Sequence, residues 1–385
     1  MKVKFIHTAD WQLGKGFSAI SDPDKRATVR RKRIESLASI GKVARENNAE
    51  FILVAGDVFD SFRPKMDVVV HSLEAIRRME LPVYAIPGNH DHGGPGGPWT
   101  QDYFIRKSKE LAPNFHILTE REKPLELDSA IIYPCPLLSQ HEPGDPTQWL
   151  RQVDDDSGKV QILLAHGTIQ DFGSDKDEES LEYRAHNHID LTRLPEESFD
   201  YMALGDWHGL KKVGNKAWYS GTHETDRFPK TAEYNSGNVL LVEAQRSKLP
   251  KVSEIPTGSL KWLVEAFQFH EDTDVEILKK KIQDKISDNS GAALLQLAVS
   301  GHISLSAHAR LKDLLNTWEA GLLRFKMTGD VSITPTEEDL IILTQGENPL
   351  VTNVARQLIE KLQGPEAEIA RAALTLLYNK MEQTS

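Results

Sequence analysis

Five short polar clusters in the first 208 residues constrain the fold of this chain more than any other feature. Each cluster follows an apolar run whose length and composition predict a β-strand, so each lies where a strand passes into a loop. The clusters occupy residues 10–12, 56–60, 88–91, 166–167 and 205–208. The preceding strands are expected at residues 3–7, 51–55, 83–86, 161–165 and 201–204.

Long segments with helical periodicity separate these strands, which favours parallel neighbours in one open sheet of an α/β fold. In such sheets, ligands bind beyond the carboxyl ends of the strands, where the polar clusters would meet. The clusters offer Asp, Asn and His without a single thiolate. Because oxygen and nitrogen donors suit hard or borderline divalent cations, the sequence predicts a metal site that activates water against a phosphate ester.

In chain order the clusters read Asp-Trp-Gln, Gly-Asp-Val-Phe-Asp, Gly-Asn-His-Asp, His-Gly and Gly-Asp-Trp-His. They resemble the motifs of the calcineurin-like metallophosphoesterases, which are D-x-H, G-D-x-x-D, G-N-H-D, H and G-H-x-H. Longer segments, at residues 5–10, 56–64, 88–92 and 218–228, are similar to SbcD-type nuclease subunits of double-strand-break repair complexes. The resemblance implies a metallophosphoesterase sandwich of mixed sheets flanked by helices, followed by a small α/β capping domain and a C-terminal helical segment.

The resemblance also implies two divalent cations, manganese or alternatively magnesium, with Asp57 as the ligand that bridges them. The resemblance implies that one cation is bound by Asp10, Gln12, Asp57 and His208. The other cation would be bound by Asp57, Asn89, His166 and Asp206. By the same resemblance, the solvent ligand shared by the cations attacks phosphorus. His90 would protonate the leaving oxygen or stabilise the pentavalent phosphorus, and Asp60 would orient the imidazole ring.

Two of these positions depart from the family pattern. Gln12 stands where the first motif has His, and Asp206 stands where the last motif has its first His. A glutamine offers a neutral amide oxygen, and an aspartate adds a negative charge and a hard oxygen. Both changes favour manganese or magnesium over zinc. They leave open that the Gln12 position binds metal weakly, or only together with substrate.

Composition sets further limits. With 385 residues, two or three domains are expected, and no apolar stretch approaches the length of a membrane span. The first strand begins at Val3, which leaves no room for a signal peptide and predicts a cytoplasmic protein. Cys135 is the single cysteine, so disulfides within the chain and thiolate metal sites are excluded. Its setting predicts a packing role at the end of a strand.

The net charge of −11 weighs against a nucleic-acid partner, but the distribution of charge matters more. Acidic residues gather at 154–156 and 171–182, whereas basic residues lie near the predicted metal edge at Lys15, at 25–33 and at 211–212. These basic residues could follow a phosphate backbone. The run at 30–33 could equally be the solvated start of a helix over residues 34–44.

The second half of the chain has a different organisation. A charged, proline-containing stretch at 246–259 predicts a boundary between a nuclease domain at 1–250 and an α/β domain at 260–330. That α/β domain is expected to alternate strands and helices, and it lies where the resembled nucleases carry a DNA-capping domain. Its strands are expected at 262–269, 292–299 and 322–327, and its helices at 275–286 and 305–318.

The segment 335–385 predicts three helices, at 337–344, 350–362 and 366–381, with too few residues for a core of their own. They must dock on their own chain or on a partner. The resemblance implies the coiled coil of an SMC-like, SbcC-like ATPase. A further apolar stripe over residues 66–79 predicts a helix that packs on the core, and in the resembled family helices near this place form a homodimer.

Three functions remain open from the sequence. The leading hypothesis is a metal-dependent exo- and endodeoxyribonuclease of a DNA repair complex, favoured by the cap-like domain and by segment 218–228. A small-substrate phosphodiesterase or phosphatase is favoured by the acidic charge. A non-catalytic architectural subunit is permitted by Gln12 and Asp206, although Asp206 is itself a good metal ligand.

Overall fold

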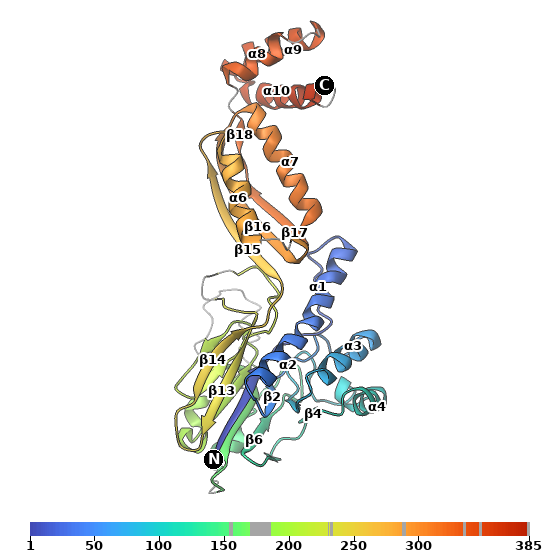
Figure 1. Cartoon of the computed structure of the whole chain (residues 1–385), viewed down its shortest axis with the longest axis vertical. Helices are drawn as coiled ribbons and strands as arrows, with labels where there is room; N and C mark the ends of the chain where they lie inside the picture. The colour runs from blue at the N-terminus through green and yellow to red at the C-terminus, as the bar shows by residue number, and fades with distance from the viewer. Residues whose placement is uncertain are drawn as a thin grey trace. The chain divides into compact units, whose positions relative to one another are not determined.

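The computed structural model describes residues 1–153, 157–169, 186–229, 231, 234–286, 290–333, 336–345 and 349–382. The two acidic stretches, 154–156 and 171–182, therefore fall outside the described residues. The chain divides into two compact units, Met1–Leu260 and Lys261–Ser385 (Figure 1). In the described part of the chain, no helix combines the length and the apolarity needed to cross a membrane.

The first unit is built on two six-stranded sheets. The first has the order β14 (Lys251–Pro256), β13 (Asn238–Gln245), β1 (Lys2–Thr8), β2 (Phe51–Val54), β3 (Val83–Ala85) and β4 (Phe115–Ile117). The second has the order β11 (Lys211–Lys212), β12 (Ala217–Tyr219), β10 (Tyr201–Gly205), β7 (Val160–His166), β6 (Ala130–Cys135) and β5 (Leu125–Glu126). Each sheet has a parallel centre and antiparallel strands at its margin.

The two sheets pack face to face because the strands alternate strictly between two cores. In β1, Phe5 enters the core between the sheets, whereas its neighbour Ile6 faces the helices. The inner core brings Phe5 against Phe51 of β2, at 5.2 Å between ring centroids, and against Tyr201 of β10, at 5.5 Å. These contacts join the sheets into a sandwich, and they confirm the predicted fold class.

The prediction of one open sheet for all five motif strands is wrong in one respect. Strands β1, β2 and β3 lie in the first sheet, whereas β7 and β10 lie in the second. Both faces of each central strand are buried, so each strand reads as an apolar run whichever sheet it joins. Local sequence therefore identifies these strands but not their neighbours.

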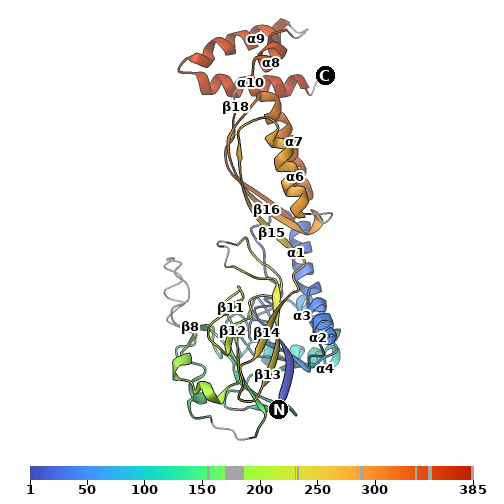
Figure 2. The ribbon, with the colours of Figure 1, turned by 60° about the vertical axis from the view of Figure 1, so that its left-hand side comes forward.

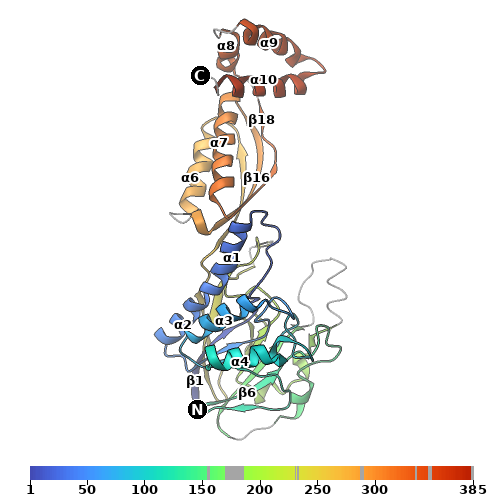
Figure 3. The same cartoon turned by 90° about the vertical axis from the view of Figure 1, so that its right-hand side faces the viewer.

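Helices cover the outer face of the first sheet, as Figure 3 shows for α2 (Leu37–Glu46), α3 (Met66–Arg77) and α4 (Asp102–Leu111). The predicted stripe on α3 is a core face, since Val69, Leu73 and Ile76 are buried against this sheet. The outer face of the second sheet packs on short 3-10 segments and holds Cys135, which is buried at the end of β6 as expected.

The basic run at 30–33 does not form the start of a helix. It lies in the second half of α1 (Pro23–Glu35), which is capped by the Asp22 side chain and begins with a proline. A carboxylate cap followed by proline is a strong start signal for a helix. The expected helix at 34–44 is thus two helices, α1 and α2, which meet at Ser36.

The second unit starts with the predicted alternation of strands and helices. Parallel strands β15 (Lys261–Phe269), β16 (Ala293–Ile303) and β17 (Arg324–Gly329) form a sheet, with β18 (Ser332–Ile333) paired to β16. Helices α6 (Asp274–Ile286) and α7 (Leu305–Gly321) cover one face of this sheet (Figure 2). The stretch 246–259 contains β14 and belongs to the first unit, since the two units divide after Leu260.

The last helices are α8 (Glu337–Gln345), α9 (Pro349–Glu360) and α10 (Ala367–Glu382). They dock on their own chain, because a small apolar cluster joins Leu343, Ala355 and Leu374 to Leu305 of α7. The face of α10 that this cluster buries includes Leu374 and Tyr378. Consequently Ile369 and Leu376 are each 71% exposed.

Candidate metal centre

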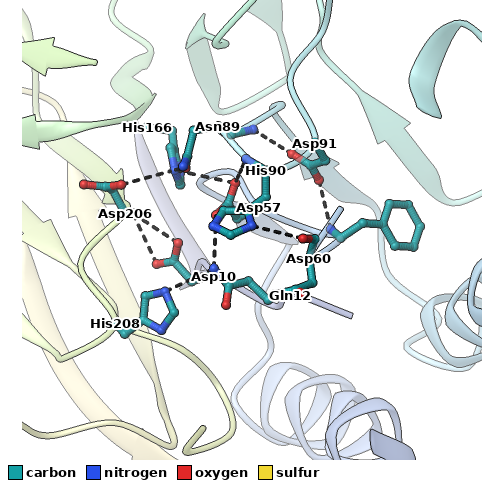
Figure 4. A network of polar contacts seen from close by, with 12 residues as sticks. Asp10, Gln12, Asp57, Asp60, Asn89, His90, Asp91, His166, Asp206 and His208 are labelled. Carbon is teal, nitrogen blue, oxygen red and sulfur yellow. Dashed lines mark hydrogen bonds and ion pairs between the residues drawn. The ribbon is translucent and has the colours of Figure 1, made fainter. Parts of the chain in front are cut away.

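The five predicted clusters meet at one edge of the sandwich, beyond the carboxyl ends of β1, β2 and β3 in one sheet and β7 and β10 in the other. Figure 4 shows the side chains directed toward a common centre. All nine residues predicted for the site lie in this group: Asp10, Gln12, Asp57, Asp60, Asn89, His90, His166, Asp206 and His208.

The backbone of these loops is held in an uncommon conformation. Asp10, Gln12, Asp57 and Asp206 all have positive φ, at 50°, 39°, 53° and 109°. Non-glycine residues rarely adopt such values, and clusters of them are typical of functional sites. Gly56 permits the close approach of two loops, since a Cβ there would lie 2.1 Å from the His166 ring.

A metal-binding group lies at the centre of the site. Ligand atoms of Asp10, Asp57 and His166, all buried, lie within 4.8 Å of one another. The Nε2 atom of His166 lies 2.9 Å from Asn89 Oδ1, and 3.8 Å from an Asp206 carboxylate oxygen. Five donors from five loops therefore surround one small volume, as the ligands of an oxygen-preferring divalent cation would.

Neighbouring groups orient these donors. The Nδ1 atom of His166 lies 2.8 Å from the carbonyl oxygen of Ala55, which can only accept, so Nδ1 carries a hydrogen and Nε2 faces the carboxylates. Thr168 donates its hydroxyl hydrogen to Asp206 at 2.6 Å. Such outer partners fix the rotamers of metal ligands, and they add to the fit of the donor set to a cation.

The electrostatics of the group require a compensating positive charge. Burial raises the pKa of Asp10 to about 6, against the opposing effect of the nearby His208 and His166. Burial disfavours the charged form of His166, yet the carboxylates of Asp57, Asp10 and Asp206 outweigh it and raise the pKa to about 9. Protons are thus retained to offset clustered negative charge, and a divalent cation would offset it more effectively.

The surroundings of Gln12 are different. Its Nε2 atom donates to Asp57 Oδ2 at 3.3 Å and lies 3.2 Å from His208 Nε2, whereas its Oε1 atom accepts from Lys15 Nζ at 2.6 Å. The other ring nitrogen of His208 lies 2.9 Å from the carboxylate of Asp226. The structure therefore brings Gln12 and His208 together, within a network of hydrogen bonds.

Sequence reasoning missed Asp226, although it lies within the segment 218–228 that supports the closer resemblance. This buried carboxylate contacts His208, Lys15 and Arg227. Burial alone would raise its pKa, but His208, Arg227 and Lys15 hold the pKa of Asp226 well below its usual range. Asp226 is therefore a negatively charged group that holds His208 and Lys15 in place beside Gln12.

His90 lies at the open side of the centre, with 40% of its side chain exposed. Its backbone N–H donates to Asp57 at 3.0 Å, and its Nε2 atom lies 3.8 Å from the other oxygen of that carboxylate. Asp60 contacts the His90 ring through its backbone carbonyl. Asp91, the last residue of the third cluster, accepts backbone N–H groups of Phe59 and Gly88 and so shapes the loop that carries Asn89 and His90.

Part of the basic run at 25–33 supports the loop after β1. Arg33 is buried and donates to the carbonyl oxygens of Asp10, Trp11 and Glu224. Arg30 donates to the carbonyl oxygen of Gly16 at 2.7 Å. Arg33 is therefore not placed to contact a phosphate backbone, because its guanidinium is used to hold the loop that presents Asp10.

Comparison with known proteins identifies the class that this fold and this centre define. The sequence profile of the calcineurin-like phosphoesterases matches residues 3–210, which is more than half of the chain. The chain belongs to this family of metallophosphoesterases. The match contains all nine predicted site residues and ends before the second unit.

A more specific relative extends beyond that match. The chain is 24% identical to the D subunit of the nuclease SbcCD from Staphylococcus epidermidis, over 72% of this chain and 76% of that protein. Among solved structures, that of TT1561 from Thermus thermophilus is 11% identical with a TM-score of 0.38, and the match covers 67% of this chain and 100% of that one. This structural likeness is too low to support an argument.

Proposed function

We propose that the chain is a metal-dependent DNA nuclease that hydrolyses phosphodiester bonds, and that it acts as the nuclease subunit of an SbcC–SbcD-like repair complex. The buried cluster of Asp10, Asp57 and His166, with His90 exposed beside it, is the observation that carries the proposal. The family match supports hydrolysis of a phosphate ester, and the distant nuclease relative supports DNA as the substrate.

The residues of the centre divide the chemistry between them. When bound, divalent cations supply Lewis acidity toward the phosphate ester and activate the attacking water. The buried donors hold the metal, manganese in preference to zinc because most of them are oxygens. Asn89 adds a neutral donor, which limits the negative charge that an incoming phosphate meets. His90 is exposed toward the substrate side and donates the proton that the leaving oxygen requires.

Side chains near the centre favour a nucleic acid over a small ester. Lys211 lies over the ring of Trp207, at 5.6 Å from its centroid. Trp207 stands between two predicted ligands and is 37% exposed. Aromatic rings with lysines beside them are suited to bases and phosphates of a nucleic-acid strand.

The test is manganese-dependent cleavage of single- and double-stranded DNA, compared with hydrolysis of a small aryl phosphodiester. The proposal predicts that DNA is cleaved with the higher kcat/KM and that His90→Ala abolishes both activities. Faster hydrolysis of the small ester would identify a small-substrate phosphodiesterase instead. No turnover of either substrate by a metal-loaded protein would identify an architectural subunit.

The proposed function includes partners. Residues 260–330 would act as the DNA-capping domain, and residues 335–385 would bind the coiled coil of an SMC-like ATPase. The exposed apolar side chains Leu350, Ile369 and Leu376, each more than 70% exposed, are suited to a helix-in-groove contact with such a coil. The protein would also form a homodimer, for which the exposed Met66 of α3 is a candidate contact.

Substitution tests the ATPase contact without deleting helices that pack on α7. Leu350→Asp with Ile369→Asp should abolish co-purification with the ATPase and leave cleavage of short single strands unchanged. Leu249→Asp, at a leucine that is 67% exposed in the first unit, is the matched control and should keep the partner. Retention of the ATPase by the double variant would contradict the proposed contact.

A further inference from the structure

The side-chain amide of Gln12 is oriented so that its oxygen atom faces Lys15 and not the metal centre. Lys15 Nζ lies 2.6 Å from one atom of the amide, and an ammonium has only hydrogens to offer, so that atom must be the carbonyl oxygen. The NH₂ group therefore faces Asp57 and His208. Because an amide nitrogen that carries two hydrogens is not a metal ligand, Gln12 points a donor at the place where the family's histidine would point a lone pair.

Two lone pairs on this side of the centre are already engaged. Asp57 Oδ2 accepts from the Gln12 NH₂ group, and so does His208 Nε2, whose opposite ring nitrogen is bound to Asp226. On the other side of the centre, His166 Nε2 faces oxygen atoms, that of Asn89 at 2.9 Å and those of Asp57 and Asp206 at 3.7 and 3.8 Å. Asp10, which the family pattern assigns to the Gln12 side, groups with Asp57 and His166.

A positive charge of the chain itself stands behind the Gln12 amide. Lys15 is fixed by Asp226 at 3.0 Å and lies 3.9 Å from Asp60, and less than a quarter of its side chain is exposed. Its ammonium is separated from the Asp57 carboxylate by a single amide group. A second divalent cation at this place would meet a like charge at short range, where little solvent screens it.

We propose that the chain holds one resident divalent cation, and that Gln12 and Lys15 replace the second cation of the family pattern with an amide and an ammonium. The inference rests on the proposed metal-dependent function. The resident position is formed by Asp10, Asp57, Asn89, His166 and Asp206. Lys15 is a positioning residue in this arrangement, because it fixes the orientation of the Gln12 amide.

Metal stoichiometry tests the inference independently of turnover. The full chain is freed of metal and titrated with Mn²⁺ alone, with binding followed by calorimetry and by electron paramagnetic resonance. The parent should bind one Mn²⁺ per chain and show the spectrum of an isolated ion. The double variant Gln12→His with Lys15→Met should bind two and show the spectrum of a magnetically coupled pair.

Controls separate this result from changes in fold or surface charge. Lys42→Met removes an exposed lysine of α2 and should keep the parent's stoichiometry, and thermal unfolding verifies that each variant is folded. A parent that binds two Mn²⁺ with similar affinity, or none, overturns the inference, and so does a folded double variant that still binds one. A parent with one Mn²⁺ that cleaves no DNA supports the inference and refutes the proposed function.

Discussion

The Nδ1 atom of His90 donates a hydrogen bond to the backbone carbonyl oxygen of Asp60 at 3.0 Å. Asp60, which the resemblance predicts to orient the imidazole, thus contacts the ring through its main chain, while its carboxylate lies 3.9 Å from Lys15 Nζ. The orientation of His90 consequently depends on the path of the loop after β2 and not on the charge of the Asp60 side chain.

We therefore expect Asp60→Ala to lower the catalytic rate only slightly and His90→Ala to lower it strongly. The alanine at position 60 keeps the carbonyl that accepts from His90, so we expect kcat to fall less than about tenfold, whereas loss of the proton donor should lower kcat about 100- to 10,000-fold. Steady-state kinetics on DNA and the metal content of each variant provide the measurement. An equal loss in both variants would show that the Asp60 carboxylate takes part directly.

Asp57→Asn should abolish hydrolysis together with metal binding. Asp57 contributes a buried carboxylate to the metal-binding group, and the amide removes its charge while keeping nearly the same shape. Circular dichroism should show a folded protein, since the amide oxygen still accepts from the His90 N–H. Activity and metal content equal to those of the parent would contradict the assignment of Asp57 as a ligand.

Asp206→Ala should weaken Mn²⁺ binding, and Thr168→Val should weaken it as well, by about 10- to 100-fold, because the threonine hydroxyl orients the Asp206 carboxylate at 2.6 Å. Asp206→His should retain metal and shift the preference toward zinc. Equilibrium titration with Mn²⁺ and Zn²⁺ measures these effects. Thr317→Val, in α7, is a control that should behave as the parent, and unchanged affinities in all variants would make Asp206 a bystander.

His7 and His223 should contribute stability that is lost in acid. Burial lowers the pKa of each to about 3, from 6.5 in the unfolded chain. Between these two pKa values, the histidine takes up a proton in the unfolded chain but not in the folded one. Its contribution to the free energy of unfolding is therefore complete above pH 6.5 and decreases as the pH falls toward 3. The contribution of each histidine to the free energy of unfolding should decrease by roughly 2 kcal/mol between pH 6.5 and 5.

Urea unfolding of metal-loaded protein at pH 7.5 and 5 measures this effect. The stability deficit of His7→Gln relative to the parent should narrow as the pH falls, because the glutamine does not titrate. Comparison of two variants at the same pH cancels the titration of the carboxylates in the metal centre. A deficit that stays constant between the two pH values would show that His7 is not the neutral, buried group that its contacts with Tyr201 and Leu204 indicate.

The sequence by itself determined the family of the chain, the kinds of most of its elements and the place of the candidate ligands. These features are local, because an apolar run of strand length followed by Asp57 or Asn89 can be recognised without knowing which strands lie beside it in the sheet. The alternation of β15, α6, β16, α7 and β17 was predicted for the same reason. The start of α1 at Asp22 and Pro23 is local as well, since a capping carboxylate followed by proline marks the first turn of a helix.

Only the tertiary structure decided which sheet each strand joins and how residues far apart in the chain meet. It placed Asp226 behind His208, buried Arg33 beneath the Asp10 loop and turned Ile369 of α10 outward. It also set the Gln12 amide by its contact with Lys15. Such contacts depend on which faces pack together and on the hydrogen-bond geometry between side chains. Neither of these produces a periodic pattern or a fixed residue spacing that could be recognised in the sequence.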